Sequence, residues 1–238
     1  MLIERASAVG FDAPVPTAPA WTAGKLVAHQ AMVHRWAAGN LTDVAFERTQ
    51  TQIHDEEGDL AAYYRDGVKV LLDALRTAPD DVKAMVFLKD APPPRRFWAR
   101  RQAHETTIHA VDAVAASLGR FPTAGECVGT LPIDVELAVD GIDELVCGFM
   151  PRGRPKIAVG EPFVLSVEPT DVDVSWALRV SPESLVTEPG LPDTSDATFT
   201  GTAAELYLGL WNRGDEVVER GSADVLARWR KVQRVTWS

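Results

Sequence analysis

Residues 95–118 read RRFWARRQAHETTIHAVDAVAASL, an uninterrupted helical pattern that lies between the triple proline of residues 92–94 and Gly119. Prolines break a helix before this stretch, and glycine is a natural residue just past a helix end. Because steps of three and four residues stay on one helix face, a single stripe carries Trp98, Glu105, Ile108, His109, Asp112 and Ala116. Buried charges are costly unless they are paired or bind a metal, so an inward-facing stripe of this kind indicates a function.

Glu105 and His109 stand four residues apart, which places a carboxylate oxygen and an imidazole nitrogen within reach of one cation. The alternative is a solvent-facing ion pair. His29 lies on the apolar face of an earlier predicted helix, which starts after Thr22 and stops near Gly39. A lone histidine on such a face is commonly a core residue. Packing of the two helices would nevertheless bring His29 towards the other pair.

Two imidazoles and one carboxylate with an open fourth position form a typical catalytic zinc set. Nickel, iron or manganese would accept the same ligands, so the metal is less closely defined than the site. The pair His104-Glu105 resembles the start of the zincin motif H-E-x-x-H, but the next histidine is five residues on. His104 and His109 are therefore about 140° apart around the helix. They cannot share a metal, which excludes a zincin protease.

Two further helices are predicted over residues 59–77 and 133–149, and the run 150–156 is rich in proline, glycine and basic residues. Beyond it the period changes to that of strands, at residues 163–167, 172–178 and 197–200, with helices at 202–211 and 222–231. We therefore predict an α+β protein of two domains. These are a four-helix bundle over residues 1–152, whose core is a usual place for a metal site, and a small α+β domain over residues 153–238.

The composition excludes several classes of function. A net charge of -10 is unfavourable for binding nucleic acid or an anionic membrane, despite the basic cluster Arg95, Arg96, Arg100 and Arg101. We expect no secretory signal and no membrane span, because no apolar run approaches ~18 residues. Cys127 and Cys147 are expected to be two thiols in a reducing cytoplasm, with a single disulfide as the alternative.

Four segments, in this order, resemble the motifs of the mycothiol-dependent maleylpyruvate isomerase family: Pro14–Thr22 leading into Leu26–His29, His104–Asp112, Ala138–Glu144 and Gly201–Arg213. Together they cover nearly the whole chain. The resemblance implies a DinB-like metal-binding bundle, followed by a small domain similar to sterol carrier proteins. Two departures are a short sequence before Trp21, and Asn212 where the family usually has glycine before an arginine.

Carried over motif by motif, the family's metal ligands fall on His29, Glu105 and His109, and its substrate-binding arginine falls on Arg213. An ordinary surface arginine is the alternative for Arg213. The expected function is therefore that of a metal-dependent isomerase or S-transferase. It would use a mycothiol-type thiol and a small electrophilic substrate, and Asp112 would orient a ligand imidazole or else form a surface pair. The alternative is a non-catalytic protein of the same fold that binds a metal or a small ligand.

Overall fold

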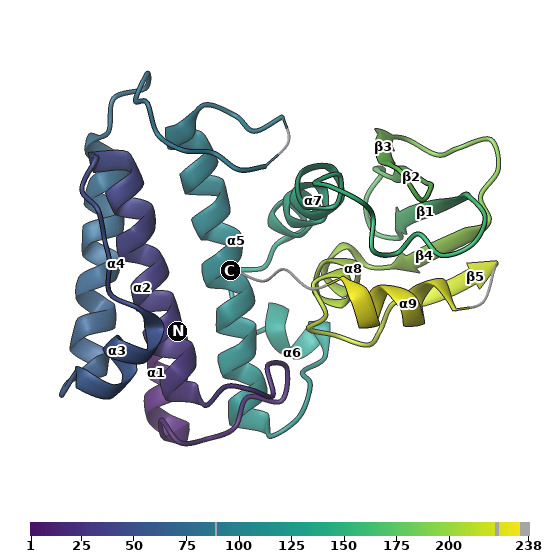
Figure 1. Ribbon diagram of the computed structural model, residues 1–238. Coiled ribbons are helices and arrows are strands. Elements are labelled where there is room, and N and C mark those ends of the chain that lie inside the picture. Colours follow the sequence, from purple (N-terminus) through teal and green to yellow (C-terminus); the bar gives the residue numbers. More distant parts are fainter. Residues whose placement is uncertain (89, 222–223, 234–238) are drawn as a thin grey trace. The chain divides into compact units, whose positions relative to one another are not determined.

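The computed structural model describes residues 1–88, 90–221 and 224–233 (Figure 1). Its contacts divide the chain into two compact units, the first of residues 1–87 and 91–122 and the second containing everything after residue 122 that is described. The first unit is helical, and the second holds a mixed β-sheet with helices. The predicted α+β architecture of a helical N-terminal part and a C-terminal sheet domain is thereby confirmed. Among the described residues, every helix is too short or too polar to cross a bilayer.

The helices of the first unit are α1 (Leu2–Val9), α2 (Ala23–Thr42), α3 (Gln50–Glu56), α4 (Leu60–Thr77) and α5 (Pro94–Leu118). Helix α2 packs against both α4 and α5, and α1 packs against α5, which builds the bundle (Figure 1). Helices α2 and α5 are buried around most of their circumference. They are therefore the two helices that can direct side chains into the interior of this unit.

Local chemistry explains where these helices begin and end. Thr22 caps α2 by accepting a hydrogen bond from the backbone of Lys25 at 3.3 Å, and Asp59 caps α4 by accepting one from Ala62 at 2.9 Å. Helix α5 has proline at its first position, where no N–H is needed, and ends at Gly119 in the left-handed conformation, φ 67°. The predicted bounds of α4 and α5 are confirmed to within one residue.

The fourth member of the bundle differs from the predicted one. Residues 133–149 form α7 (Val135–Asp143) and a π-helical turn η1 (Glu144–Phe149), which follow the short helix α6 (Ala124–Val128) in the second unit. The first unit instead holds two short helices, α1 and α3, beside α2, α4 and α5, and neither short helix was predicted from the sequence. We placed the domain boundary between residues 152 and 153, whereas the contacts group residues 123–152 with the sheet.

Hydrogen bonds within the second unit explain this grouping. The indole of Trp211 donates to the carbonyl of Gly141 at 3.0 Å, and the hydroxyl of Thr187 donates to the carbonyl of Val146 at 2.6 Å. A methyl group at Gly141 would lie 2.2 Å from the ring of Tyr207, so glycine permits the close approach of α7 and the helix α8 (Ala203–Leu210). Gly141 is thus a packing site in the interior of α7.

The described strands of the second unit are β1 (Phe163–Pro169), β2 (Trp176–Val180), β3 (Leu185–Pro189), β4 (Ala197–Gly201) and β5 (Val218–Gly221), in the sheet order β3-β2-β1-β4-β5. Strand β1 pairs antiparallel with β2 and parallel with β4, with Leu165 opposite Leu178 and Ala197. Burial alternates along β4, as expected for a strand with one face on the core. Helices α8 (Ala203–Leu210) and α9 (Val225–Val232) complete the unit.

Two predicted elements of this unit differ in extent. The strand predicted at residues 172–178 instead spans Trp176–Val180, and Asp171, just before the predicted strand, accepts a hydrogen bond from the first backbone N–H of α8, at Ala203. Strands β3 and β5 were not predicted. The helix predicted at residues 222–231 starts at Val225, and residues 222 and 223 lie outside the described residues. Cys127 and Cys147, both described, are not joined in a disulfide.

Candidate metal centre

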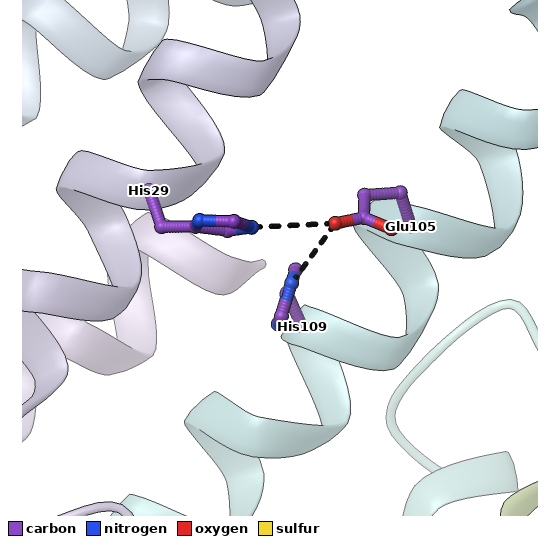
Figure 2. A group of neighbouring side chains, drawn as sticks. All are labelled: His29, Glu105 and His109. Atoms are coloured by element: carbon purple, nitrogen blue, oxygen red, sulfur yellow. Dashed lines mark hydrogen bonds and ion pairs between the residues drawn. The ribbon is translucent and has the colours of Figure 1, made fainter. Parts of the chain in front are cut away.

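Helices α2 and α5 bring three potential metal ligands together. Figure 2 shows His29 of α2 pointing towards Glu105 and His109 of α5. Nε2 of His29 lies 3.4 Å from Oε1 of Glu105, and Nε2 of His109 lies 3.2 Å from the same oxygen. The candidate ligand atoms of all three residues lie within 4.8 Å of one another. The exposed fractions are only 4%, 4% and 6%, so the group is almost wholly inside the protein.

Arg101 compensates the buried charge of Glu105. Its guanidinium, 0% exposed, donates from Nη2 to Oε2 of Glu105 at 2.9 Å, one helical turn away. Burial alone would raise the pKa of Glu105, but hydrogen bonds from the two histidines and the charge of Arg101 hold that pKa well below its usual range. Glu105 is therefore a carboxylate, with one oxygen bound by Arg101 and the other directed at the imidazoles.

The two histidines of the group differ in protonation. Burial lowers the pKa of His29, and its hydrogen bond with Glu105 only partly opposes this. Burial would also lower the pKa of His109, but hydrogen bonds with Asp112 and Glu105 outweigh it and raise that pKa to about 9. A neutral imidazole can offer a lone pair to a metal directly, whereas His109 must release a proton to do so.

Asp112 and Thr17 extend the group away from the three potential ligands. Oδ2 of Asp112 accepts a hydrogen bond from Nδ1 of His109 at 2.8 Å, and Oδ1 of Asp112 accepts one from the hydroxyl of Thr17 at 2.5 Å. Asp112 is completely buried, so it does not form the surface pair that the sequence left open. The indole of Trp21 covers the two imidazoles, with ring centroids 4.7 Å from His29 and 5.6 Å from His109.

Two other buried histidines lie outside this group. His34 is enclosed by Gln30 at 2.8 Å and Thr106 at 3.1 Å, and its burial lowers its pKa to about 3. His104 is also buried, but among the described residues the cluster with metal-ligand spacing does not include it. This agrees with the helical argument that His104 and His109 face different directions.

Arg213 belongs to the second unit, in the turn that follows α8. Its backbone N–H donates to Leu208 at 2.7 Å, and its Nη1 donates to the carbonyl of Trp211 at 3.0 Å. The preceding Asn212 has a φ of 59°, in the left-handed region. Asparagine tolerates this region better than most residues, so it can stand where the family usually has glycine. The departure noted in the sequence therefore preserves the turn.

The contributions of Arg101, Thr17 and Trp21 to this centre were not predicted from the sequence. Arg101 was assigned to a basic surface cluster, although its spacing of four from Glu105 is a signal for an ion pair on one helix face. Trp21 was noted only within a motif. Thr17 gave no signal, because its partner Asp112 is 95 residues away and no periodicity relates them.

Comparisons with known proteins assign the sequence to a family. The family model described as the mycothiol maleylpyruvate isomerase N-terminal domain matches residues 2–114, and the family model of the corresponding C-terminal domain, described as the MDMPI C-terminal domain, matches residues 136–231. No curated protein matches the chain significantly.

Among solved structures, the crystal structure of the mycothiol-dependent maleylpyruvate isomerase aligns with a TM-score of 0.54 and 17% identity. The alignment covers 92% of this chain and 86% of that one, and it supports a shared fold. A UbiJ-SCP2 ubiquinone synthesis protein aligns over 40% of this chain and 91% of its own, with 23% identity and a TM-score of 0.28, too low to support an argument. The two family models span most of the sequence, and the chain therefore belongs to the mycothiol maleylpyruvate isomerase family.

Proposed function

We propose that the protein is a metal-dependent enzyme that uses a small thiol of the mycothiol type, acting on a small electrophile as an isomerase or S-transferase. One observation carries the proposal: two imidazole nitrogens, from His29 and His109, lie 3.4 and 3.2 Å from one carboxylate oxygen in a nearly buried position. The name of the matching N-terminal family model supports the choice of thiol.

The residues fit a divalent metal, and we propose zinc. Tetrahedral zinc with bonds of about 2.0–2.1 Å keeps its ligand atoms about 3.3–3.4 Å apart, close to the two observed separations. Nickel, iron and manganese accept the same donors, so the proposal for zinc rests on the spacing of the ligand atoms. A divalent cation held by His29, Glu105 and His109 would deprotonate a coordinating thiol, supplying a nucleophile for isomerisation of a double bond or for S-transfer.

The surrounding side chains have roles of their own. Asp112 accepts from Nδ1 of His109, which fixes the orientation of the ring and directs Nε2 towards Glu105. Arg101 binds the other oxygen of Glu105 and balances its charge. Trp21 covers both imidazoles and limits the access of water to them. We propose that Arg213 binds an anionic group of the electrophile, because guanidinium pairs with carboxylates in a forked geometry.

Metal analysis tests the centre. Wild type, Glu105→Ala and the exposed control Glu47→Ala would be purified without added metal, and their metal content measured by mass spectrometry. We expect about one divalent ion per chain in wild type and control, lost or much reduced in Glu105→Ala. Equal contents in wild type and Glu105→Ala would remove Glu105 from the site.

Thiol binding then separates an enzyme from a protein that only binds metal. The metal-loaded protein should bind the thiol, and turnover of an activated electrophile should require both metal and thiol. Metal binding without any thiol affinity would favour the non-catalytic alternative. Turnover without thiol would count against the proposed chemistry.

A further inference from the structure

The proline-rich segment before α2 is a closed and internally bonded loop. Two β-turns follow one another, the first closed by Ala18 N to Val15 O at 2.9 Å and the second by Trp21 N to Ala18 O at 2.8 Å. Each turn has proline at its second position, where the fixed φ of the ring is already correct. A hydrogen bond from Val15 N to Trp21 O, 3.1 Å, joins the two ends.

This loop, residues 14–22, contacts the candidate metal centre at two points. Thr17, in the first turn, is buried and donates its hydroxyl hydrogen to Oδ1 of Asp112 at 2.5 Å. Trp21, at the end of the second turn, lies over the imidazoles of His29 and His109. The two turns fix the spacing between these residues, so a single rigid element contacts both helices that supply the potential ligands.

Asp112 connects Thr17 to a potential ligand, His109, through two hydrogen bonds. Asp112 accepts from Thr17 through Oδ1 and from Nδ1 of His109 through Oδ2, and it lies completely inside the protein. A carboxylate that could rotate would orient the imidazole less well than one held at both oxygens. The hydroxyl of Thr17 therefore restricts the rotation of Asp112, and through it the direction in which His109 presents Nε2.

We propose that Thr17 is a positioning residue of the metal centre, acting through Asp112 on the orientation of His109. This inference rests on the proposed function, since it assigns to Thr17 a part in metal binding. Under this proposal the loop of residues 14–22 does more than lead into α2: Trp21 contacts both imidazoles, and Thr17 aligns one of the potential ligands.

The test compares Thr17→Val, which has nearly the same shape but no hydroxyl, with Thr17→Ser, which keeps the hydroxyl. Zinc affinity would be measured by competition with a chelator, and the geometry of the site by the absorption spectrum of the cobalt(II)-loaded protein. Direct partners of metal ligands change affinity by about 10–100-fold, so for this residue, one bond further out, we expect a loss of about 3–10-fold. Thr17→Ser should restore both affinity and spectrum.

Thermal unfolding of the same proteins without metal separates positioning from a merely structural role. A structural role would lower the unfolding temperature of Thr17→Val and leave zinc affinity and the cobalt spectrum unchanged, which would overturn the proposal. Equal losses in Thr17→Val and Thr17→Ser would also overturn it, since the hydroxyl would not be the cause. If Thr17→Val does not fold, Thr17→Ala takes its place. Absence of zinc binding in wild type would instead overturn the proposed function itself.

Discussion

Arg101 donates a hydrogen bond to Glu105 at 2.9 Å, and both side chains lie inside the protein on one face of α5. A buried carboxylate without a positive partner would be costly, and it would tend to take up a proton. Because Arg101 binds Oε2, Oε1 remains directed at the imidazoles of His29 and His109. The ion pair thus adds to the hydrogen bonds from His109 and His29 that keep Glu105 ionised, and it limits which of its oxygens a metal can use.

Removal of Arg101 should therefore destabilise the protein strongly. Arg101→Met leaves Glu105 buried without this partner, and breaking a buried ion pair in this way typically costs about 3–5 kcal/mol. The free energy of unfolding, measured by urea denaturation, should fall by this order. A double variant with Glu105→Gln should recover part of the loss, because the charge is removed together with its partner. A double variant no more stable than Arg101→Met would contradict the assignment.

Asp112→Asn tests the orientation of His109. Asparagine keeps the shape of the side chain but removes the negative charge that holds Nδ1. We expect zinc affinity to fall by about 10–100-fold, as is usual when the carboxylate partner of a ligand histidine is lost. Asp55→Asn is a matched control, because Asp55 forms a similar contact with His54, 2.7 Å, at an exposed position of α3. A similar loss of affinity in both variants would point to a general effect of charge.

The convergence of His29, Glu105 and His109 could be predicted because two signals in the sequence agree. Glu105 and His109 are related by one turn of a well-delimited helix, and His29 lies on the apolar face of another. Helix α1 could not be predicted, because it is only eight residues long and no side-chain cap marks its first turn. The apolar pattern of residues 133–149 is equally compatible with packing against a sheet.

Other features depend on contacts between distant residues. Strands β3 and β5 are short and largely exposed, so they have little hydrophobic alternation to reveal them. The hydrogen bond of Thr17 with Asp112 joins a loop to a helix across most of the first unit's sequence. Periodicity reports only which face of an element is buried, whereas such contacts depend on how the elements are packed.

His34 should make the stability of the protein depend on pH. Its pKa is about 3 in the folded protein because it is buried, compared with about 6.5 in an unfolded chain. Between these values the unfolded chain binds one more proton than the folded protein, so stability falls as the pH falls below about 6.5, by up to about 1.4 kcal/mol per pH unit. Urea denaturation from pH 7 to pH 4.5 should show a shallower fall for His34→Gln. His54→Gln, at a partly exposed position, controls for the loss of a histidine as such. If the free energy of unfolding falls equally with pH in wild type and in His34→Gln, the buried His34 does not cause the pH dependence.

Gly141→Ala should destabilise the second unit although alanine is the better helix former. Replacement of a glycine inside a helix gains about 1 kcal/mol in helix propensity. Here the added methyl group would meet the ring of Tyr207 at 2.2 Å, and overpacking of this kind typically costs about 1–3 kcal/mol. We expect a net loss in thermal stability, and Tyr207→Leu should make the same substitution at Gly141 less harmful. A more stable Gly141→Ala protein would show that α7 and α8 can move apart at little cost.

The proposed role of Arg213 in substrate binding can be tested separately from metal binding. If its guanidinium binds an anionic group of the electrophile, Arg213→Met should lower kcat/KM by about 10–100-fold, the value of a charge-assisted hydrogen bond. The loss should appear mainly in KM and should be small for an uncharged electrophile. Arg213→Lys keeps the charge but not the forked geometry, so its effect should be intermediate.

Zinc content should not change in either variant, and Arg220→Met, at an exposed position of β5, should resemble wild type. Equal losses with charged and uncharged electrophiles would assign Arg213 to the structure of the turn after α8, where its side chain already bonds the carbonyl of Trp211.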